Sequence, residues 1–391
     1  MKGAYPKGVS VAQDKYKTEP VVEPDLEIDD ENAIEFEEEE TTNEPFDPTK
    51  IRVDTRPMTI DLVLSRINHD ELDLAPDFQR KEGIWKEAAK SRLIESILIR
   101  IPLPAFYLDA TNEDNWLVVD GLQRLSALKE FVIDKQLRLK GLEYLKEMEG
   151  KNYDELPRNY QRRIGETLLT LYLIEKGTPP EVKYNIFKRI NTGGLPLSPQ
   201  ELRHALNPGK ATKLLARLAE FPEFKQVINL GESKKARRDD HEFILGFLAY
   251  TITNYKDYPL KQGRDYFFNE TLASVNKMND AEIKAIEAKF RKVMVAAFEI
   301  FGDRAFRKLS SENPAKKYPI NKSLFEGWSA CLGNLTDEQI EVLIQRKTKL
   351  LQKFINCMET DESFVKSISQ ASQKVSYRFT IIEHIIEEVL V

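Results

Sequence analysis

A short apolar run ends at Asp120, whose carboxylate could act in catalysis or binding. Residues 117–124 read LVVDGLQR, and an apolar helix is expected to follow. A strand that ends at Asp120 and a tight turn at Gly121 would present the unpaired N–H groups of a helix start to an anion. Arg124 in the first turn opposes the helix dipole, but its planar guanidinium can hold a phosphate there. The alternative is that Asp120 caps the helix and Arg124 pairs with it, and spacing alone does not separate the two.

Two further segments combine basic, amide and glycine residues. Residues 76–85 place Gln79 and Arg80 in a loop before an apolar helix. Residues 187–194 end a helix with arginine, threonine, a glycine pair and Asn191. Taken singly, each segment is also explained as a solvated basic face or a glycine-rich helix end.

Together the three segments resemble the N-terminal domain of GmrSD-type, modification-dependent restriction systems, whose core is similar to that of ParB and sulfiredoxin. The family signature Asp-Gly-Gln-Gln-Arg is similar to residues 120–124, with Leu122 in place of the first glutamine. The other two elements match Pro76, Phe78, Gln79, Arg80 and Trp85, and Phe187, Arg189, Asn191, Gly193, Gly194, Leu197, Glu201 and Arg203. The resemblance covers about residues 56–206 and continues more loosely in Arg237, Arg238, Asp239 and Glu242 and in residues 321–326, as in stand-alone members with a helical C-terminal half.

The resemblance implies a nucleoside-triphosphate site, in some members with hydrolysis, that serves DNA restriction against phage. Asp120 and Arg124 would act in catalysis, and the cofactor would be a nucleoside triphosphate with Mg²⁺. The residues that would bind the nucleotide are Gln79, Arg80, Gly121, Gln123, Arg124 and Asn191. Leu122 leaves the outcome open. Loss of an amide that positions water would weaken hydrolysis but not binding, whereas a position on the apolar side of the helix would make the change neutral.

Other catalytic motifs are incomplete. Gly209-Lys210 lacks both the Ser/Thr and the first glycine of a Walker A loop. The four histidines lie far apart and lack the context of an HNH nuclease, and the two cysteines exclude a disulfide framework or a four-thiolate zinc site. Asp77 with residues 181–183 imitates a PD-(D/E)xK nuclease, but Glu181 follows two prolines at a helix start. We therefore expect no metal site made by the protein alone.

Hydrophobic periodicity predicts the elements that position these segments. Strands are expected at 71–74, 105–108, 116–119 and 168–174, and helices at 58–67 and 180–190 and along the apolar faces 93–101 and 125–132. Asn207-Pro208-Gly209 ends this mixed part, and helical periodicity alone continues beyond it. The predicted fold class is α+β: a ParB/sulfiredoxin-like mixed α/β domain over residues 51–206, then an all-helical domain over residues 207–391. The apolar stripe at 382–390 would pack within that domain or bind a partner.

The charge is unevenly distributed along the chain. The sequence has 58 Lys and Arg against 64 Asp and Glu, a net charge of −6. Residues 1–50 hold 15 acidic and 5 basic residues, a net of −10, which leaves +4 for the rest. With five prolines and little apolar periodicity, this segment is predicted to be a disordered acidic tail. It would solvate the protein, or compete with nucleic acid or dock a basic partner. The positive net charge of residues 51–391 is small, which favours a focused phosphate pocket around Arg80 and Arg124 over a broad basic surface.

The longest apolar run, residues 243–252, is about half of the ~18–20 residues that span a membrane, and residues 1–10 have no signal-peptide core. We expect a cytoplasmic protein without a membrane partner. The expected function is to bind and hydrolyse a nucleoside triphosphate in a DNA restriction or anti-phage system, with DNA and a nuclease or a second copy as partners. The alternatives are a non-hydrolysing ParB-like DNA-binding protein, with contacts from residues 162–163 and 234–238, and a direct DNA nuclease. A weaker alternative is a scaffold or antitoxin-like protein that acts through the acidic tail.

Overall fold

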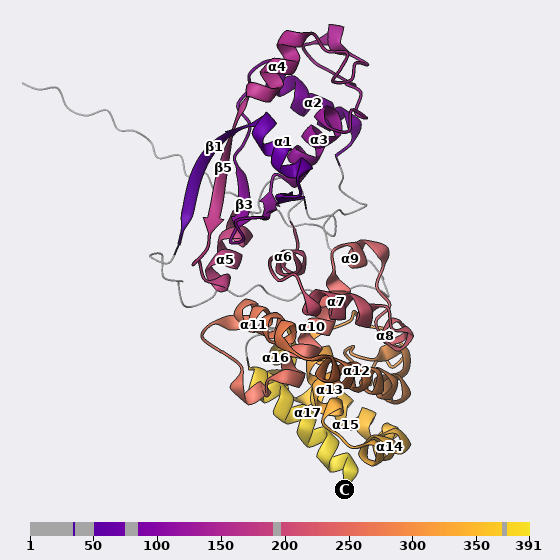
Figure 1. The fold of residues 1–391 in the computed structure, drawn as a ribbon. Helices are drawn as coiled ribbons and strands as arrows, with labels where there is room; N and C mark the ends of the chain where they lie inside the picture. The colour runs from indigo at the N-terminus through magenta and orange to yellow at the C-terminus, as the bar shows by residue number, and fades with distance from the viewer. Residues whose placement is uncertain (1–33, 36–50, 75–84, 191–196, 370–373) are drawn as a thin grey trace, which may run out of the picture.

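The computed structural model describes residues 34–35, 51–74, 85–190, 197–369 and 374–391. A part that contains a β-sheet comes first, and a helical part follows it (Figure 1). The fold is therefore α+β, as predicted. The predicted acidic tail lies outside the described residues, apart from Ile34 and Glu35.

Five strands form one mixed sheet in the order β1-β5-β3-β4-β2. The strands are β1 (Val53–Thr59), β2 (Leu72–Asp73), β3 (Phe106–Ala110), β4 (Trp116–Asp120) and β5 (Leu168–Glu175). β5 runs antiparallel to β1 and parallel to β3, whereas β3 and β4 are antiparallel and β4 and β2 are parallel. In this register Asp120, the last residue of β4, lies opposite Tyr107 of β3.

Helices cover the two faces of the sheet unequally. One face packs in a core with α1 (Ile60–Asn68), α2 (Glu87–Leu98), α3 (Leu122–Val132) and α4 (Arg158–Glu166). The other face packs in a smaller core with α5 (Pro180–Ile190) and α6 (Pro199–Leu206), which lie between the sheet and the helical part (Figure 1). Alternation along β5 explains the division, because Leu171 and Leu173 face the first core and Ile174 the second.

Several details of this part differ from the sequence prediction. Met58 belongs to β1 and pairs with Leu169, so the predicted helix begins later, at Ile60. Ile101 lies beyond the end of α2 and is 50% exposed, so it is not on the apolar face of that helix. β1 and α4 were not predicted. β1 is an edge strand that is largely exposed, and α4 is strongly polar, so neither shows the usual apolar pattern.

The helical part is built around one large hydrophobic core. Its helices are α7 (Lys210–Ala219), α8 (Pro222–Val227), α9 (Glu232–Ala236), α10 (Asp239–Ile252), α11 (Gly263–Lys277), α12 (Asp280–Phe301), α13 (Lys322–Gly333), α14 (Asp337–Gln345), α15 (Lys347–Thr360), α16 (Glu362–Ser369) and α17 (Val375–Leu390). The apolar stripe of α17, including Ile382 and Val389, is buried in this core, which accounts for it without a partner. Over the described residues, every helix is too short or too polar to span a bilayer.

Candidate functional site

A single residue, Gly121, connects β4 to α3. Its φ of +99° lies in the left-handed region, and a Cβ atom at this position would lie 2.3 Å from Cδ1 of Phe106. Both the conformation and the close approach therefore require glycine. Gly121 is also the N-cap of α3, and no described side chain caps this helix start. The first amides of α3 are thus left for another acceptor, which makes this helix start suitable for an anion.

Arg124 is held on several sides at this turn. Its NH2 group pairs with Oδ2 of Asp120 at 2.7 Å and donates to the Ala105 carbonyl at 3.1 Å, and its NH1 group donates to the Pro104 carbonyl. The guanidinium carbon lies 4.3 Å from the centroid of the Phe106 ring, a cation–π arrangement. One alternative from the sequence was that Asp120 caps α3 and Arg124 pairs with Asp120. The structure has the ion pair but not the cap.

Burial affects the protonation of both members of this pair. It raises the pKa of Asp120, although Arg124 and a hydrogen bond with the Gly121 backbone act in the opposite direction. It lowers the pKa of Arg124, against the effect of Asp120. The two side chains are 29% and 11% exposed. Charge interactions in such a partly desolvated place are stronger than in water, and the carboxylate is still accessible to solvent.

The second predicted segment ends beside this turn. The Trp85 amide donates to Oε1 of Gln123 at 3.2 Å, so the end of residues 76–85 is bonded to the first turn of α3. Gln79 and Arg80 themselves lie outside the described residues.

The third segment reaches the same strand from the other face of the sheet. Phe187 of α5 packs in one core with Val119, the residue before Asp120. Asn191 lies outside the described residues. The described parts of the three segments therefore come together at β4 and α3, and sequence order alone does not show this.

Leu122, the departure from the family signature, is partly buried and packs against the core formed by α1 to α4. Leu122 therefore lies on the apolar side of α3. At such a position, leucine in place of the first glutamine of the signature is expected not to affect hydrolysis.

Sequence reasoning missed two features on the other face of the sheet. Lys183 of α5 donates to Asp109 Oδ2 at 2.7 Å and to Thr111 Oγ1 at 2.9 Å. Lys183 lies on a helix, as predicted, so the pattern at 181–183 lacks the strand that a PD-(D/E)xK nuclease requires. Tyr107, opposite Asp120, stacks on Tyr172 at 5.0 Å between ring centroids. The sequence signals that could have indicated these features are the acidic Asp109 and the aromatic Tyr107, which both lie in an otherwise apolar strand.

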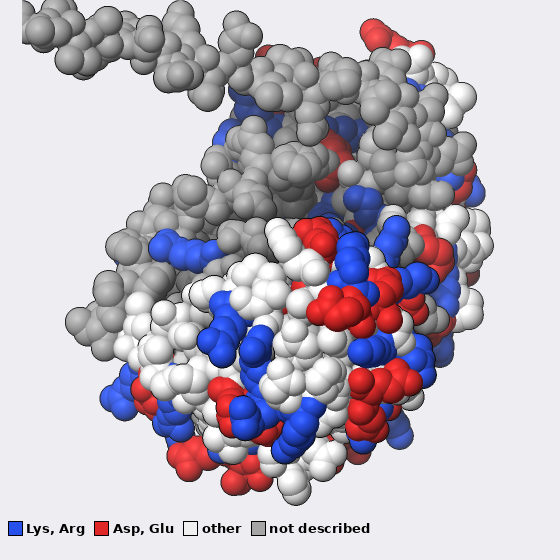
Figure 2. All heavy atoms as spheres, turned by 90° about the horizontal axis from the view of Figure 1, so that it is seen from above, with Lys and Arg blue, Asp and Glu red and all other residues white. Residues whose placement is uncertain are grey.

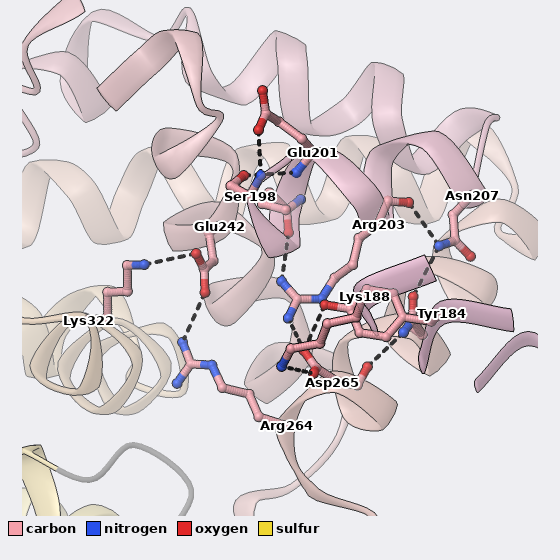
Figure 3. Close-up of polar contacts among 12 residues, drawn as sticks. Tyr184, Lys188, Ser198, Glu201, Arg203, Asn207, Glu242, Arg264, Asp265 and Lys322 are labelled. Carbon is pink, nitrogen blue, oxygen red and sulfur yellow. Dashed lines mark hydrogen bonds and ion pairs between the residues drawn. The ribbon is translucent and has the colours of Figure 1, made fainter. Parts of the chain in front are cut away.

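A cluster of buried charges joins α5 and α6 to the helical part (Figure 3). The carboxylate of Asp265, on α11, accepts hydrogen bonds from Tyr184 and Lys188, each at 3.1 Å, and pairs with Arg203. The Arg203 side chain is only 2% exposed. Burial raises the pKa of Asp265, but Arg203 and Lys188 outweigh it and hold that pKa below its ordinary value.

The cluster continues between α10, α11 and α13. Glu242 pairs with Lys322 at 2.8 Å, and Glu326 pairs with Arg264 at 2.6 Å. Burial raises the pKa of Glu242, but neighbouring cations outweigh it and lower that pKa to about 2. The looser part of the family resemblance thus contributes residues to this junction. Within the described ranges, no group of three or more His, Cys, Asp or Glu side chains is arranged to hold a metal ion.

The fold is α+β, and the strand-to-helix turn between β4 and α3 holds the Asp120–Arg124 pair. Residues 61–207 match the family described as GmrSD restriction endonuclease, N-terminal domain. This part of the chain belongs to that family, which confirms the resemblance. The matched span runs from α1 to the end of α6 and includes the Asp120 turn. No curated protein and no solved structure matches the chain.

Proposed function

We propose that this protein binds a nucleoside triphosphate, together with Mg²⁺, at the start of α3 and hydrolyses it. The reaction would control attack on DNA, directly or through a partner nuclease, in a restriction system that acts against phage. The observation that carries the proposal is the start of α3 beside the Asp120–Arg124 pair, which no side chain of the described residues caps, in a part of the chain that matches a restriction endonuclease family.

The residues at this turn suit phosphoryl transfer, which depends mainly on positioning and on stabilisation of charge. The first amides of α3 and the helix dipole favour a phosphate. Arg124 is already oriented by the carbonyls of Pro104 and Ala105 and by the Phe106 ring, so little reorganisation is needed to stabilise developing negative charge. Asp120, which is accessible and has a raised pKa, would orient the attacking water or accept its proton.

The donor set also fits Mg²⁺ bound with its nucleotide. Mg²⁺ is commonly held by one or two carboxylates, waters and substrate phosphates, and not by a cage of protein ligands. Asp120 supplies a carboxylate of this kind at the helix start. When bound, the ion would neutralise phosphate charge.

Other predicted binding residues have indirect support. The Trp85–Gln123 hydrogen bond places the end of the segment that carries Gln79 and Arg80 beside the turn. Asn191 follows α5, which packs against β4. The contact of Leu122 with the core supports hydrolysis as well as binding, because a residue on that side of α3 is poorly placed to orient water.

A thermal-shift screen against the four ribonucleoside triphosphates with Mg²⁺ tests the binding step. A ligand at 100 times its dissociation constant adds about 2.7 kcal/mol to the free energy of unfolding, which is easily measured. Release of inorganic phosphate from the nucleotide that shifts the transition then tests turnover. If none of the four nucleotides changes the unfolding temperature, the binding site is rejected.

Arg124→Lys tests the role of the arginine while keeping its charge. We expect phosphate release to fall by about tenfold or more, because lysine lacks the planar guanidinium. Arg138→Lys is the matched control, since Arg138 is exposed and pairs with Glu155 at 2.9 Å away from the turn. Equal turnover in the two variants would remove Arg124 from the mechanism.

A second candidate is duplex-DNA binding without turnover through the basic stretches. Several of their side chains have partners within the protein: Arg162 pairs with Glu166, Arg163 donates to the Leu98 carbonyl, and Lys235 pairs with Glu232. On the face in Figure 2, blue and red side chains are interspersed over the coloured surface, which favours the pocket over a broad basic surface. Phosphate contacts would give a log–log salt slope of about −0.9 per contact. An affinity that does not change with salt would reject this role.

A further inference from the structure

Two residues from the acidic N-terminal segment contact the helical part. Ile34 forms a parallel β-bridge with Ile320, and the Glu35 amide donates to the Ile320 carbonyl at 2.8 Å. Ile320 also forms an antiparallel bridge with Arg307. Ile34 therefore adds a third extended segment beside two that belong to the helical part.

The side chain of Glu35 is bound by two groups. Its Oε1 atom pairs with Lys308 Nζ at 2.5 Å, and its Oε2 atom accepts a hydrogen bond from Asn321 Nδ2 at 3.0 Å. The side chains of Glu35 and Lys308 are 21% and 23% exposed, so the ion pair is partly shielded from water. Charge-assisted bonds of this kind are stronger than neutral ones.

Asn321 is held in place independently of Glu35. It is fully buried, and its Oδ1 atom caps α13 by accepting from the Leu324 amide at 2.7 Å. Its Nδ2 atom also donates to the Ile368 carbonyl at 2.9 Å. The Glu35 carboxylate thus lies at the start of α13, where the helix dipole favours a negative charge.

Ile34 provides the apolar part of the contact, since it is partly buried against the core of the helical part. A backbone bridge, an apolar contact and a carboxylate site together have the form of peptide recognition by strand addition. The neighbouring sequence is acidic on both sides, with residues 29–31 and 37–40.

We propose that Arg307, Lys308, Ile320 and Asn321 form a docking site for an extended acidic peptide, and that residues 34–35 of the same chain occupy it. The site reads an apolar residue followed by a glutamate. Residues 34–35 then anchor the N-terminal segment to the helical part. The basic partner of this segment is Lys308 of the same chain.

Carbodiimide coupling of the full-length chain tests the ion pair directly. This reagent joins a carboxylate to an amine with loss of water only when the two are in contact, and peptide mass spectrometry should find Glu35 joined to Lys308 within one chain. Lys308→Arg is a matched control that keeps the charge but forms no amide with Glu35. Absence of the coupled peptide from the unmodified chain, or its formation between two chains, would overturn docking within one chain.

Hydrogen exchange gives a readout that does not depend on coupling. The peptide that contains residues 34–35 should exchange more slowly, by about tenfold or more at the bonded amide, than other N-terminal peptides. The protection should persist in Lys308→Arg and be lost in Lys308→Glu. Equal exchange in all three proteins would reject the site.

Discussion

The turn at Arg124 and the junction at Arg203 each place an arginine against an aspartate, but their surroundings differ. Asp120 faces Arg124, is 29% exposed, and has a pKa raised by burial. Asp265 faces Arg203 and also Lys188, and these two cations lower its pKa despite burial. A carboxylate with one cation in a partly desolvated place still favours a further positive or hydrogen-bonding group. A carboxylate with two cations and the hydroxyl of Tyr184 is already satisfied.

The difference separates a site suited to a ligand from one that joins two parts of the protein. Among the residues that the structure describes, no side chain caps the helix start at the turn, whereas the polar groups around Asp265 come from α5, α6 and α11 and bind one another. The number of ion pairs alone would not distinguish the two places. The number of cations around each carboxylate, and the direction in which its pKa is shifted, distinguish them.

The largest expected effect is at the junction. Asp265→Asn leaves Arg203 and Lys188 without their carboxylate, and we expect the free energy of unfolding to fall by about 3–5 kcal/mol, because a buried charge loses its partner. Denaturant titration measures this. Asp134→Asn is the control, since Asp134 pairs with Lys129 near the surface and the same change there should cost about 0–1 kcal/mol. Similar costs at the two positions would contradict the contrast between them.

The next effect is at the turn. Gly121→Ala should destabilise the protein by about 2–4 kcal/mol, because it adds a Cβ atom both at positive φ and against Phe106. Gly150→Ala separates the two causes, since Gly150 has a φ of +77° and nothing within 4 Å of the added atom. The control should cost only about 1–2 kcal/mol in the same titration. If the two variants lose equal stability, the contact with Phe106 is not a constraint on the turn.

The smallest effect concerns a buried histidine near the junction. Burial, with Arg238 and His204, lowers the pKa of His241 to about 3, so the folded state favours the neutral ring. The unfolded state binds the proton first, so stability is present above about pH 6.5 and is lost as the pH falls toward 3. Between about pH 7.5 and about pH 5.5 the loss is roughly 1 kcal/mol.

His241→Gln isolates this contribution from that of its neighbour. Burial raises the pKa of Asp240 to about 6, so the stability that it contributes at low pH is lost as the pH rises through that value, the opposite sign. Denaturant titrations at the two pH values should therefore show a smaller loss on acidification in His241→Gln than in the unmodified protein. The same loss in both proteins would show that His241 titrates normally.

Much of the local structure could be predicted because its signals are local. Apolar runs bounded by polar turns located β3, β4 and β5, and the structure has α5 over the predicted residues 180–190. β1 was missed because it is an exposed edge strand whose place depends on pairing with β5, more than one hundred residues later. Of the predicted site, Asp120, Gly121, Gln123 and Arg124 lie together at one turn. Gln79, Arg80 and Asn191 lie outside the described residues, and the roles of all seven stay predictions.

The fold class and the strand–glycine–helix turn could be predicted from local signals, because periodicity and a glycine between Asp120 and Leu122 act over a few residues. The motifs of the three segments carried the family resemblance, which the match over residues 61–207 supports. The contacts of the charged groups could not be predicted in this way. Arg124 is oriented by carbonyls about twenty residues earlier, and Arg203 meets Asp265 from a different part of the fold. Burial and neighbouring charges set the strength of these contacts, and both arise only when distant segments pack together.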